Sequence, residues 1–76
     1  MRHLADDITD QVIDRFIDQR KKLGLSHEKL AEKAGLHRSA ISLIESKKRS
    51  PSLKNCLCIA MALELELAKI IKETSD

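Results

Sequence analysis

The chain has 76 residues, of which 42% are hydrophobic and 34% charged, and its formal net charge is +2. This length allows one domain with a small core, and the single proline and two glycines suit a mostly helical chain. No apolar run is long enough to span a membrane, and the acidic N-terminal stretch lacks the apolar segment of a signal peptide. We therefore expect one cytoplasmic domain over residues 1–76.

The charge and the cysteines narrow the class further. Residues 20–54 hold ten Lys and Arg against three Glu, whereas the segments on either side are net acidic. A basic centre indicates a surface for an anionic partner, although charge alone also fits an ordinary solvated surface. Cys56 and Cys58 point to different sides of a helix, and they form no metal-binding pattern with the scattered histidines. We expect no disulfide between them, no metal and no cofactor.

The first expected helix covers about residues 6–23. Its apolar residues recur at three- and four-residue steps. Aspartates lie near its beginning and a basic triplet in its last turn, where the helix dipole favours each charge. Gly24 then supplies the left-handed residue with which many helices end.

Two short helices are expected next, over residues 27–34 and from 37 or 38 to 45. Ser26 is a suitable N-cap for the first of them. Gly35 supplies the positive φ that a tight turn between the two helices requires. This pattern predicts a helix-turn-helix over about residues 27–46.

The outer face of the second of these helices carries residue types that read DNA. Four side chains lie on it, away from the core: Arg38, Ser39, Ser42 and Leu43. In the major groove arginine can fork to guanine, serine can bond several bases and leucine can meet a thymine methyl. The following loop is basic, with Lys47, Lys48 and Arg49. We expect this loop to bind phosphates. We expect the same of the backbone amides at the start of the helix over residues 27–34, beside Ser26.

Two more helices are expected, one from the N-cap Ser52 to about residue 63 and one over about 67–73. The inward stripe of the first is predicted to be Leu53, Cys56, Ile59, Ala60 and Leu63. Further apolar residues exceed what so small a core needs. We expect a symmetric homodimer through residues 53–73, with Leu57, Met61 and Leu67 or Ile70 at the seam, unless Leu57 and Met61 complete the core.

The stretch "GLSHEKLAEKAGLHRSAISLIESKKRSPSL", followed by "IAMAL", resembles the Xre/Cro family of phage-repressor-like helix-turn-helix regulators over about residues 15–71. "GLHRSAIS" and "SLKN" are also similar to controller proteins of restriction–modification systems. The resemblance implies an all-α, compact five-helix lambda-repressor-like DNA-binding domain. It implies a sequence-specific transcriptional regulator, a repressor or controller, acting as a homodimer on a palindromic double-stranded DNA operator.

The resemblance also implies roles for single residues. His27 matches a phosphate-contacting position that usually holds Gln, and its charged form would strengthen phosphate binding as the pH falls toward about 6.5. The alternative is a surface histidine that is only weakly involved. His37 matches a position at the start of the DNA-facing helix that faces bases or nearby phosphates, and we expect it to contact a phosphate. Arg20 and Glu45 match an ion pair that ties the first helix to the end of the third.

Two residues depart from the family pattern at positions that usually hold glycine. Lys47 must accept either left-handed strain or a different loop. Glu64 lies between the last two expected helices, so these either bend less sharply or run on as one helix.

A different class of function stays open beside the regulator. An antitoxin-type module would neutralise a co-encoded protein partner, with the acidic first helix facing a basic toxin, and would autoregulate its operon. No long disordered neutralising tail supports this alternative. No Ser/His/Asp set, carboxylate pair or phosphate loop converges in the sequence, so we do not expect an enzyme.

Overall fold

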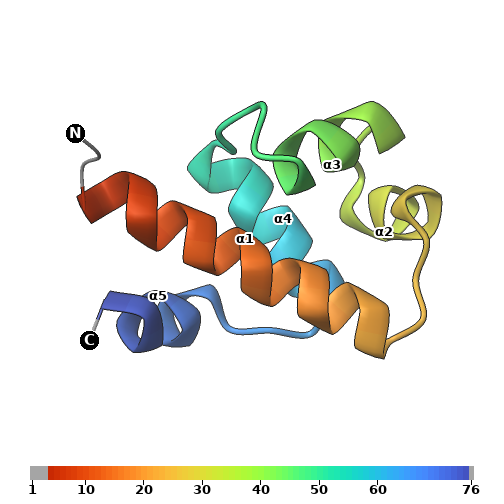
Figure 1. Cartoon of the computed structure of the whole chain (residues 1–76). Helices are drawn as coiled ribbons and strands as arrows, with labels where there is room; N and C mark the ends of the chain where they lie inside the picture. The colour runs from red at the N-terminus through yellow and green to blue at the C-terminus, as the bar shows by residue number, and fades with distance from the viewer. Residues whose placement is uncertain (1–3, 76) are drawn as a thin grey trace.

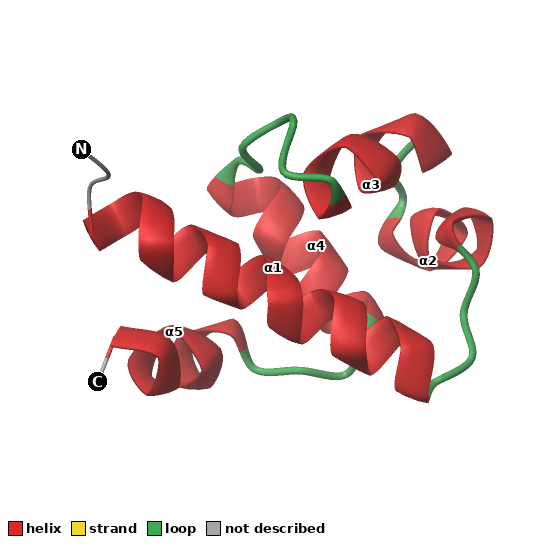
Figure 2. Cartoon of the chain, viewed as in Figure 1, coloured by secondary structure: helices red, strands yellow, loops and turns green. Residues whose placement is uncertain are grey.

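The computed structural model describes residues 4–75, which form five α-helices and no strand. The helices are α1 (Leu4–Lys22), α2 (His27–Ala34), α3 (Arg38–Glu45), α4 (Leu53–Ala62) and α5 (Leu67–Ser75). α1 crosses the molecule, with α5 packed along one side of it and α3 on the other, while α2 packs on α3 and α4 (Figure 1). Short loops join the helices (Figure 2). The expected all-α five-helix fold is confirmed.

One aliphatic core lies between the helices, and every helix contributes to it. Its buried members are Val12, Ile13, Phe16, Leu30, Ala31, Ile41, Ile44, Ile59, Ala60, Leu63, Leu67 and Ile70. Phe16, the single aromatic residue of the chain, is 2% exposed. No polar or charged side chain is buried among the described residues. The fold therefore depends on apolar burial, at about 25 cal/mol per Å² removed from water.

The helix ends follow from local capping chemistry. The hydroxyl oxygens of Ser26 and Ser52 each accept a hydrogen bond of 3.0 Å, from the backbone N–H of Lys29 and of Asn55 respectively. Gly24, two residues beyond the last residue of α1, has a φ of +69°. Both predicted N-caps and the left-handed stop are confirmed, because these signals act within four residues of the chain.

The turn between α4 and α5 contains a non-glycine residue in the left-handed region. Glu64 has a φ of 60°, and the amide of Leu65 donates to the carbonyl of Ala60 at 2.8 Å. The side-chain amide of Gln19 donates to the carbonyl of Leu63 at 3.1 Å, which ties the turn to α1. The two helices are separate, and the alternative of one continuous helix is wrong.

Three apolar residues lie elsewhere than the sequence suggested. Leu53, expected in the core, is 69% exposed. It is the first residue of α4, and helical side chains lean toward the N-terminus, so it extends past the core. Leu67 and Ile70, expected near a dimer seam, are only 7% and 2% exposed. They are buried within the chain, since α5 packs on α1, and are unavailable to a partner.

Candidate nucleic-acid interface

α2 and α3 form a helix-turn-helix whose turn depends on Gly35. Gly35 has a φ of +70°, and the amide of Leu36 donates to the carbonyl of Ala31 at 2.9 Å. A Cβ built on Gly35 would meet no heavy atom within 4 Å. Space is therefore not the constraint, and glycine is favoured there because other residues strain the backbone at positive φ. Ile41 and Ile44, each 1% exposed, anchor α3 to the core.

The opposite face of α3 is open to solvent. Arg38, Ser39 and Ser42 are exposed, and Leu43 is half-buried. His37 is the N-cap residue of α3, with an extended backbone, an exposed side chain and no side-chain capping bond. These five residues, singled out from the sequence, lie together on and before one exposed helix.

The basic loop after α3 is held by its own backbone. The amides of Lys48 and Arg49 both donate to the carbonyl of Leu43, at 3.0 and 3.2 Å. Lys47 has a φ of 63°, and its Nζ lies 2.8 Å from Oδ1 of Asp14 in α1. Of the two structures that the sequence allowed for Lys47, the strained left-handed one is present. Its ion pair with Asp14 was not anticipated.

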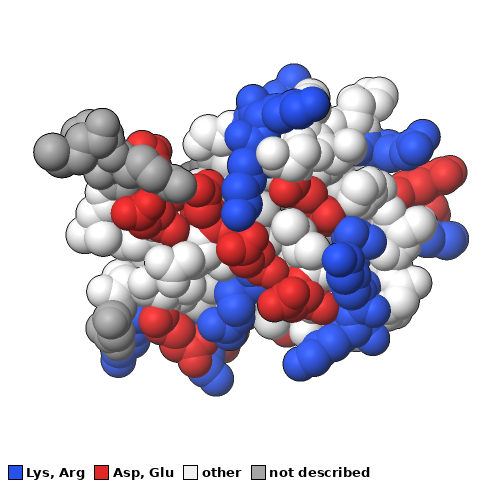
Figure 3. Space-filling view, in the orientation of Figure 1, with Lys and Arg blue, Asp and Glu red and all other residues white. Residues whose placement is uncertain are grey.

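Acidic and basic side chains gather over different parts of the face that Figure 3 shows. Figure 3 shows acidic groups gathered over α1, with Lys and Arg groups over the loop after α3 and near the last turn of α1. A duplex lying against α3 would meet the basic loop, and the aspartates of α1 would limit how far it extends across that helix.

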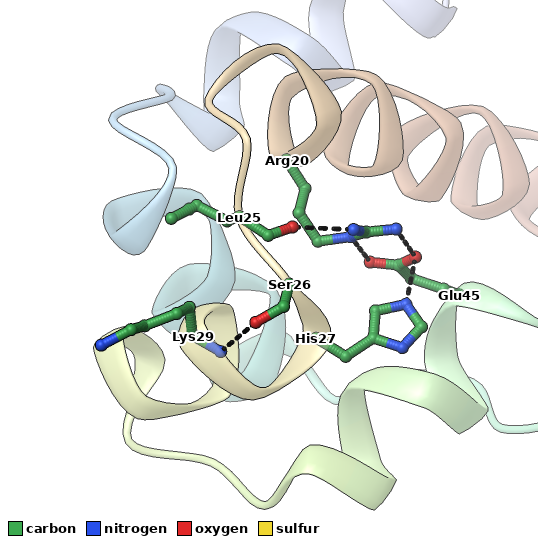
Figure 4. A network of polar contacts seen from close by, with 6 residues as sticks. All are labelled: Arg20, Leu25, Ser26, His27, Lys29 and Glu45. Carbon is green, nitrogen blue, oxygen red and sulfur yellow. Dashed lines mark hydrogen bonds and ion pairs between the residues drawn. The ribbon is translucent and has the colours of Figure 1, made fainter.

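A network of hydrogen bonds and ion pairs connects α1, α2 and α3 (Figure 4). Arg20 donates to both carboxylate oxygens of Glu45, from Nε at 2.7 Å and from Nη2 at 2.9 Å. Its Nη1 donates to the carbonyl of Leu25 at 2.8 Å. The Arg20 and Glu45 side chains are only 13% and 10% exposed, so water screens this bidentate pair weakly. The predicted ion pair is confirmed.

His27 belongs to the same network, which sequence reasoning missed. Its Nε2 lies 2.9 Å from Oε1 of Glu45. Burial alone would raise the pKa of Glu45, but the hydrogen bonds from Arg20 and His27 outweigh burial and hold that pKa below its ordinary value. Glu45 is therefore ionised at neutral pH. A histidine at the first position of α2 and a carboxylate at the end of α3 are 18 residues apart, and no local signal joins them.

One of the surface hollows is mainly apolar. A groove of about 290 Å³ between the ends of α1, α4 and α5 is lined mainly by apolar residues, among them Ile8, Leu53, Cys56 and Ile71. Burial raises the pKa of the Cys56 thiol, which reduces its reactivity. Within residues 4–75 no group of histidine, cysteine and acidic side chains could hold a metal, and no helix is both apolar and long enough to cross a membrane.

The chain is similar to known proteins in both sequence and structure. The helix-turn-helix family model matches residues 17–70. The control protein C.SmaI of Serratia marcescens is 34% identical over 65 residues, which cover 86% of this chain and 77% of that protein. The crystal structure of the restriction–modification controller protein C.AhdI from Aeromonas hydrophila has a TM-score of 0.74 and 36% identity, covering 84% of this chain and 96% of that one. A mutant of the controller protein C.Esp1396I gives a TM-score of 0.73 at 28% identity, covering 95% and 90%.

The fold, the exposed face of α3 and these matches define a DNA-binding transcription regulator. The chain belongs to the helix-turn-helix family of the Xre type. Its relatives are transcriptional controller proteins and not enzymes, which confirms the expectation that this chain is no enzyme.

Proposed function

We propose that this chain is a controller of a restriction–modification system, acting in the cytoplasm as a homodimer on a palindromic operator. The observation that carries the proposal is the exposed face of α3. α3 is the second helix of a helix-turn-helix, and a basic loop follows it in the chain. Similarity to three proteins named as controllers supports the particular role.

Base reading is assigned to α3. Arg38 is its first residue, at the end that enters the major groove in helix-turn-helix proteins, and would fork to a guanine. Ser39 and Ser42 are exposed beside it and can bond base edges. Leu43 is half-buried at the edge of the face, where a thymine methyl would cover it.

Phosphate contacts are assigned to the surroundings of α3. Lys48 and Arg49 have exposed side chains and form no ion pair with other described residues. At the start of α2 the Ser26 hydroxyl is used in capping, so the contact there would come from backbone amides and from His27. On DNA binding, the ammonium of Lys47 would leave its ion pair with Asp14 and contact a phosphate instead.

The dimer seam is assigned to the exposed stripe of α4. Leu53, Leu57 and Met61 recur at four-residue steps and are 69%, 45% and 76% exposed. Ile71, 40% exposed, lines the same apolar groove as Leu53. These residues replace Leu67 and Ile70 in the seam. Three large apolar side chains in one row are unusual for a monomer surface and favour a self-complementary contact.

The proposal is tested by selecting binding sites from random duplex DNA with the purified chain at near-physiological salt. A two-fold symmetric consensus with half-sites about one helical turn apart is expected. A variant that carries Arg38→Ala, Ser39→Ala and Ser42→Ala keeps the core and should enrich no motif. Enrichment of the same motif by this variant, or of none by the wild type, would overturn the proposal.

The antitoxin-type alternative relies on the acidic face of α1. Asp14 on that face is already paired with Lys47, which weakens its case as a docking residue. A stoichiometric basic protein that copurifies with the chain, together with the absence of any selected motif, would favour the alternative.

A further inference from the structure

The imidazole of His27 contacts the Glu45 carboxylate and could also contact a DNA phosphate. Its Nε2 contacts Glu45 at 2.9 Å, and its side chain is still 34% exposed. Figure 4 shows Nδ1 on the far side of the ring from the Glu45 carboxylate. Nδ1 has no hydrogen-bond partner among the described residues. The ring therefore has one occupied nitrogen and one that is available to a ligand.

The number of protons on the ring decides what that ligand can be. A neutral imidazole carries one N–H, and the other nitrogen is an acceptor. Glu45 is ionised and accepts only, so the N–H of a neutral His27 is on Nε2. Nδ1 then presents a lone pair, which repels a phosphate oxygen. Only the imidazolium can donate to Glu45 and to a phosphate together.

The charges around the ring favour that second proton once DNA is bound. Glu45 from α3 contacts the ring directly, and Arg20 from α1 donates to both oxygens of Glu45, including the Oε1 that the ring contacts. In the free chain Arg20 already offsets the charge of Glu45. A phosphate at the start of α2 would add a negative charge next to Nδ1 and would stabilise the imidazolium.

We propose that His27 bridges Glu45 to a DNA phosphate only as the imidazolium, so that DNA binding takes up as much as one proton per protomer. The proposal rests on the proposed function, which places a phosphate at this end of α2. It makes DNA binding stronger as the pH falls.

His37 supplies the internal comparison. It is exposed, and no side-chain capping bond fixes its tautomer. A neutral His37 can turn its one N–H toward a phosphate without gaining a proton. Proton uptake should therefore depend on His27 and not on His37.

The experiment measures the affinity for one fixed DNA duplex from about pH 6 to 8 at constant salt. Proton uptake is counted by calorimetry in buffers of different ionisation enthalpy. For the wild type, affinity should rise as the pH falls, by up to about tenfold per pH unit for each proton taken up. His27→Gln should flatten this dependence and keep binding at about pH 8, because one amide group carries two donors and no proton is needed. His37→Gln and His3→Gln should keep the wild-type slope.

A pH-independent wild type, or an unchanged slope in His27→Gln, would overturn the proposal. The duplex need not be an operator, because every duplex presents phosphates. If site selection finds no motif but proton uptake still vanishes in His27→Gln, the proposed function fails and the phosphate bridge stands. If a motif is found and the slope persists in His27→Gln, only the bridge fails.

Discussion

Lys47 has a φ of 63°, and its ammonium lies 2.8 Å from the carboxylate of Asp14, so the loop after α3 is strained in its backbone and tied to α1 by its side chain. A non-glycine residue in the left-handed region costs about 1–2 kcal/mol. The two side chains are 38% and 58% exposed, and such pairs contribute about 0–1 kcal/mol. The pair offsets the strain only in part. A lysine here thus accepts backbone strain and places a positive charge beside α3.

Lys47→Gly should therefore separate stability from DNA binding. Relief of strain should raise the free energy of unfolding by less than about 1 kcal/mol, because glycine's extra freedom in the unfolded chain and the loss of the ion pair with Asp14 both offset part of the gain. The salt slope of DNA affinity should fall by about one. Urea unfolding and fluorescence anisotropy measure the two effects. Glu64→Gly, at a φ of 60°, is the matched control and should stabilise without weakening DNA binding. Loss of stability in both variants would contradict the assignment of strain.

Glu45→Gln should destabilise the chain in a pH-dependent way. The change leaves the Arg20 guanidinium, 13% exposed, without its anion, and we expect a loss of about 2–3 kcal/mol at pH 7. Because the pKa of Glu45 is lowered by folding, its contribution is present above the ordinary value of 4.5 and is lost as the pH falls below that value.

The gap between wild type and Glu45→Gln in urea unfolding should thus narrow from pH 7 to about pH 3.5. Glu73→Gln breaks the exposed pair with Arg15, whose side chains are both 45% exposed, and should cost less than about 0.5 kcal/mol. A gap of constant size across this pH range would show that the charge of Glu45 does not stabilise the fold.

Arg38→Ala and Lys48→Ala should weaken DNA binding in different ways. Arg38→Ala should remove about 1–3 kcal/mol of discrimination at one base position of the selected site. Lys48→Ala should weaken all sequences alike and flatten the salt slope by about one. Anisotropy titrations against the selected site and its single-base variants, at several salt concentrations, distinguish these outcomes. Identical behaviour of the two variants would remove Arg38 from the base-reading set.

Met61→Glu should produce monomers. Met61 is 76% exposed in the free chain, so the change leaves the core intact, while a charge placed in an apolar seam is costly. Sedimentation equilibrium should show a loss of association, and affinity for a palindromic site should fall with it. Leu43→Glu makes the same kind of change on α3 and should abolish DNA binding while association persists. Unaltered association of Met61→Glu would move the seam away from α4.

Local signals in the sequence determined most of the helix pattern. Ser26, Ser52, Gly24 and Gly35 each act through backbone groups within a few residues, so the ends of α2 and the start of α4 were predictable without any packing. The spacing of Ile41 and Ile44 likewise decided which face of α3 stays exposed. The all-helical class, the helix-turn-helix and the candidate DNA-facing residues follow from these short-range rules.

Only the tertiary structure decided the contacts that join distant segments. The Nε2 contact of His27 with Glu45 and the pairing of Lys47 with Asp14 depend on how α1, α2 and α3 pack. The exposure of Leu53 and the burial of Ile70 depend on where α4 begins and where α5 lies. The spacing of apolar residues along a helix indicates which side chains should be buried. It does not indicate whether the same chain or a second copy of it covers them. That choice is made by the global packing, because the same local spacing is compatible with either.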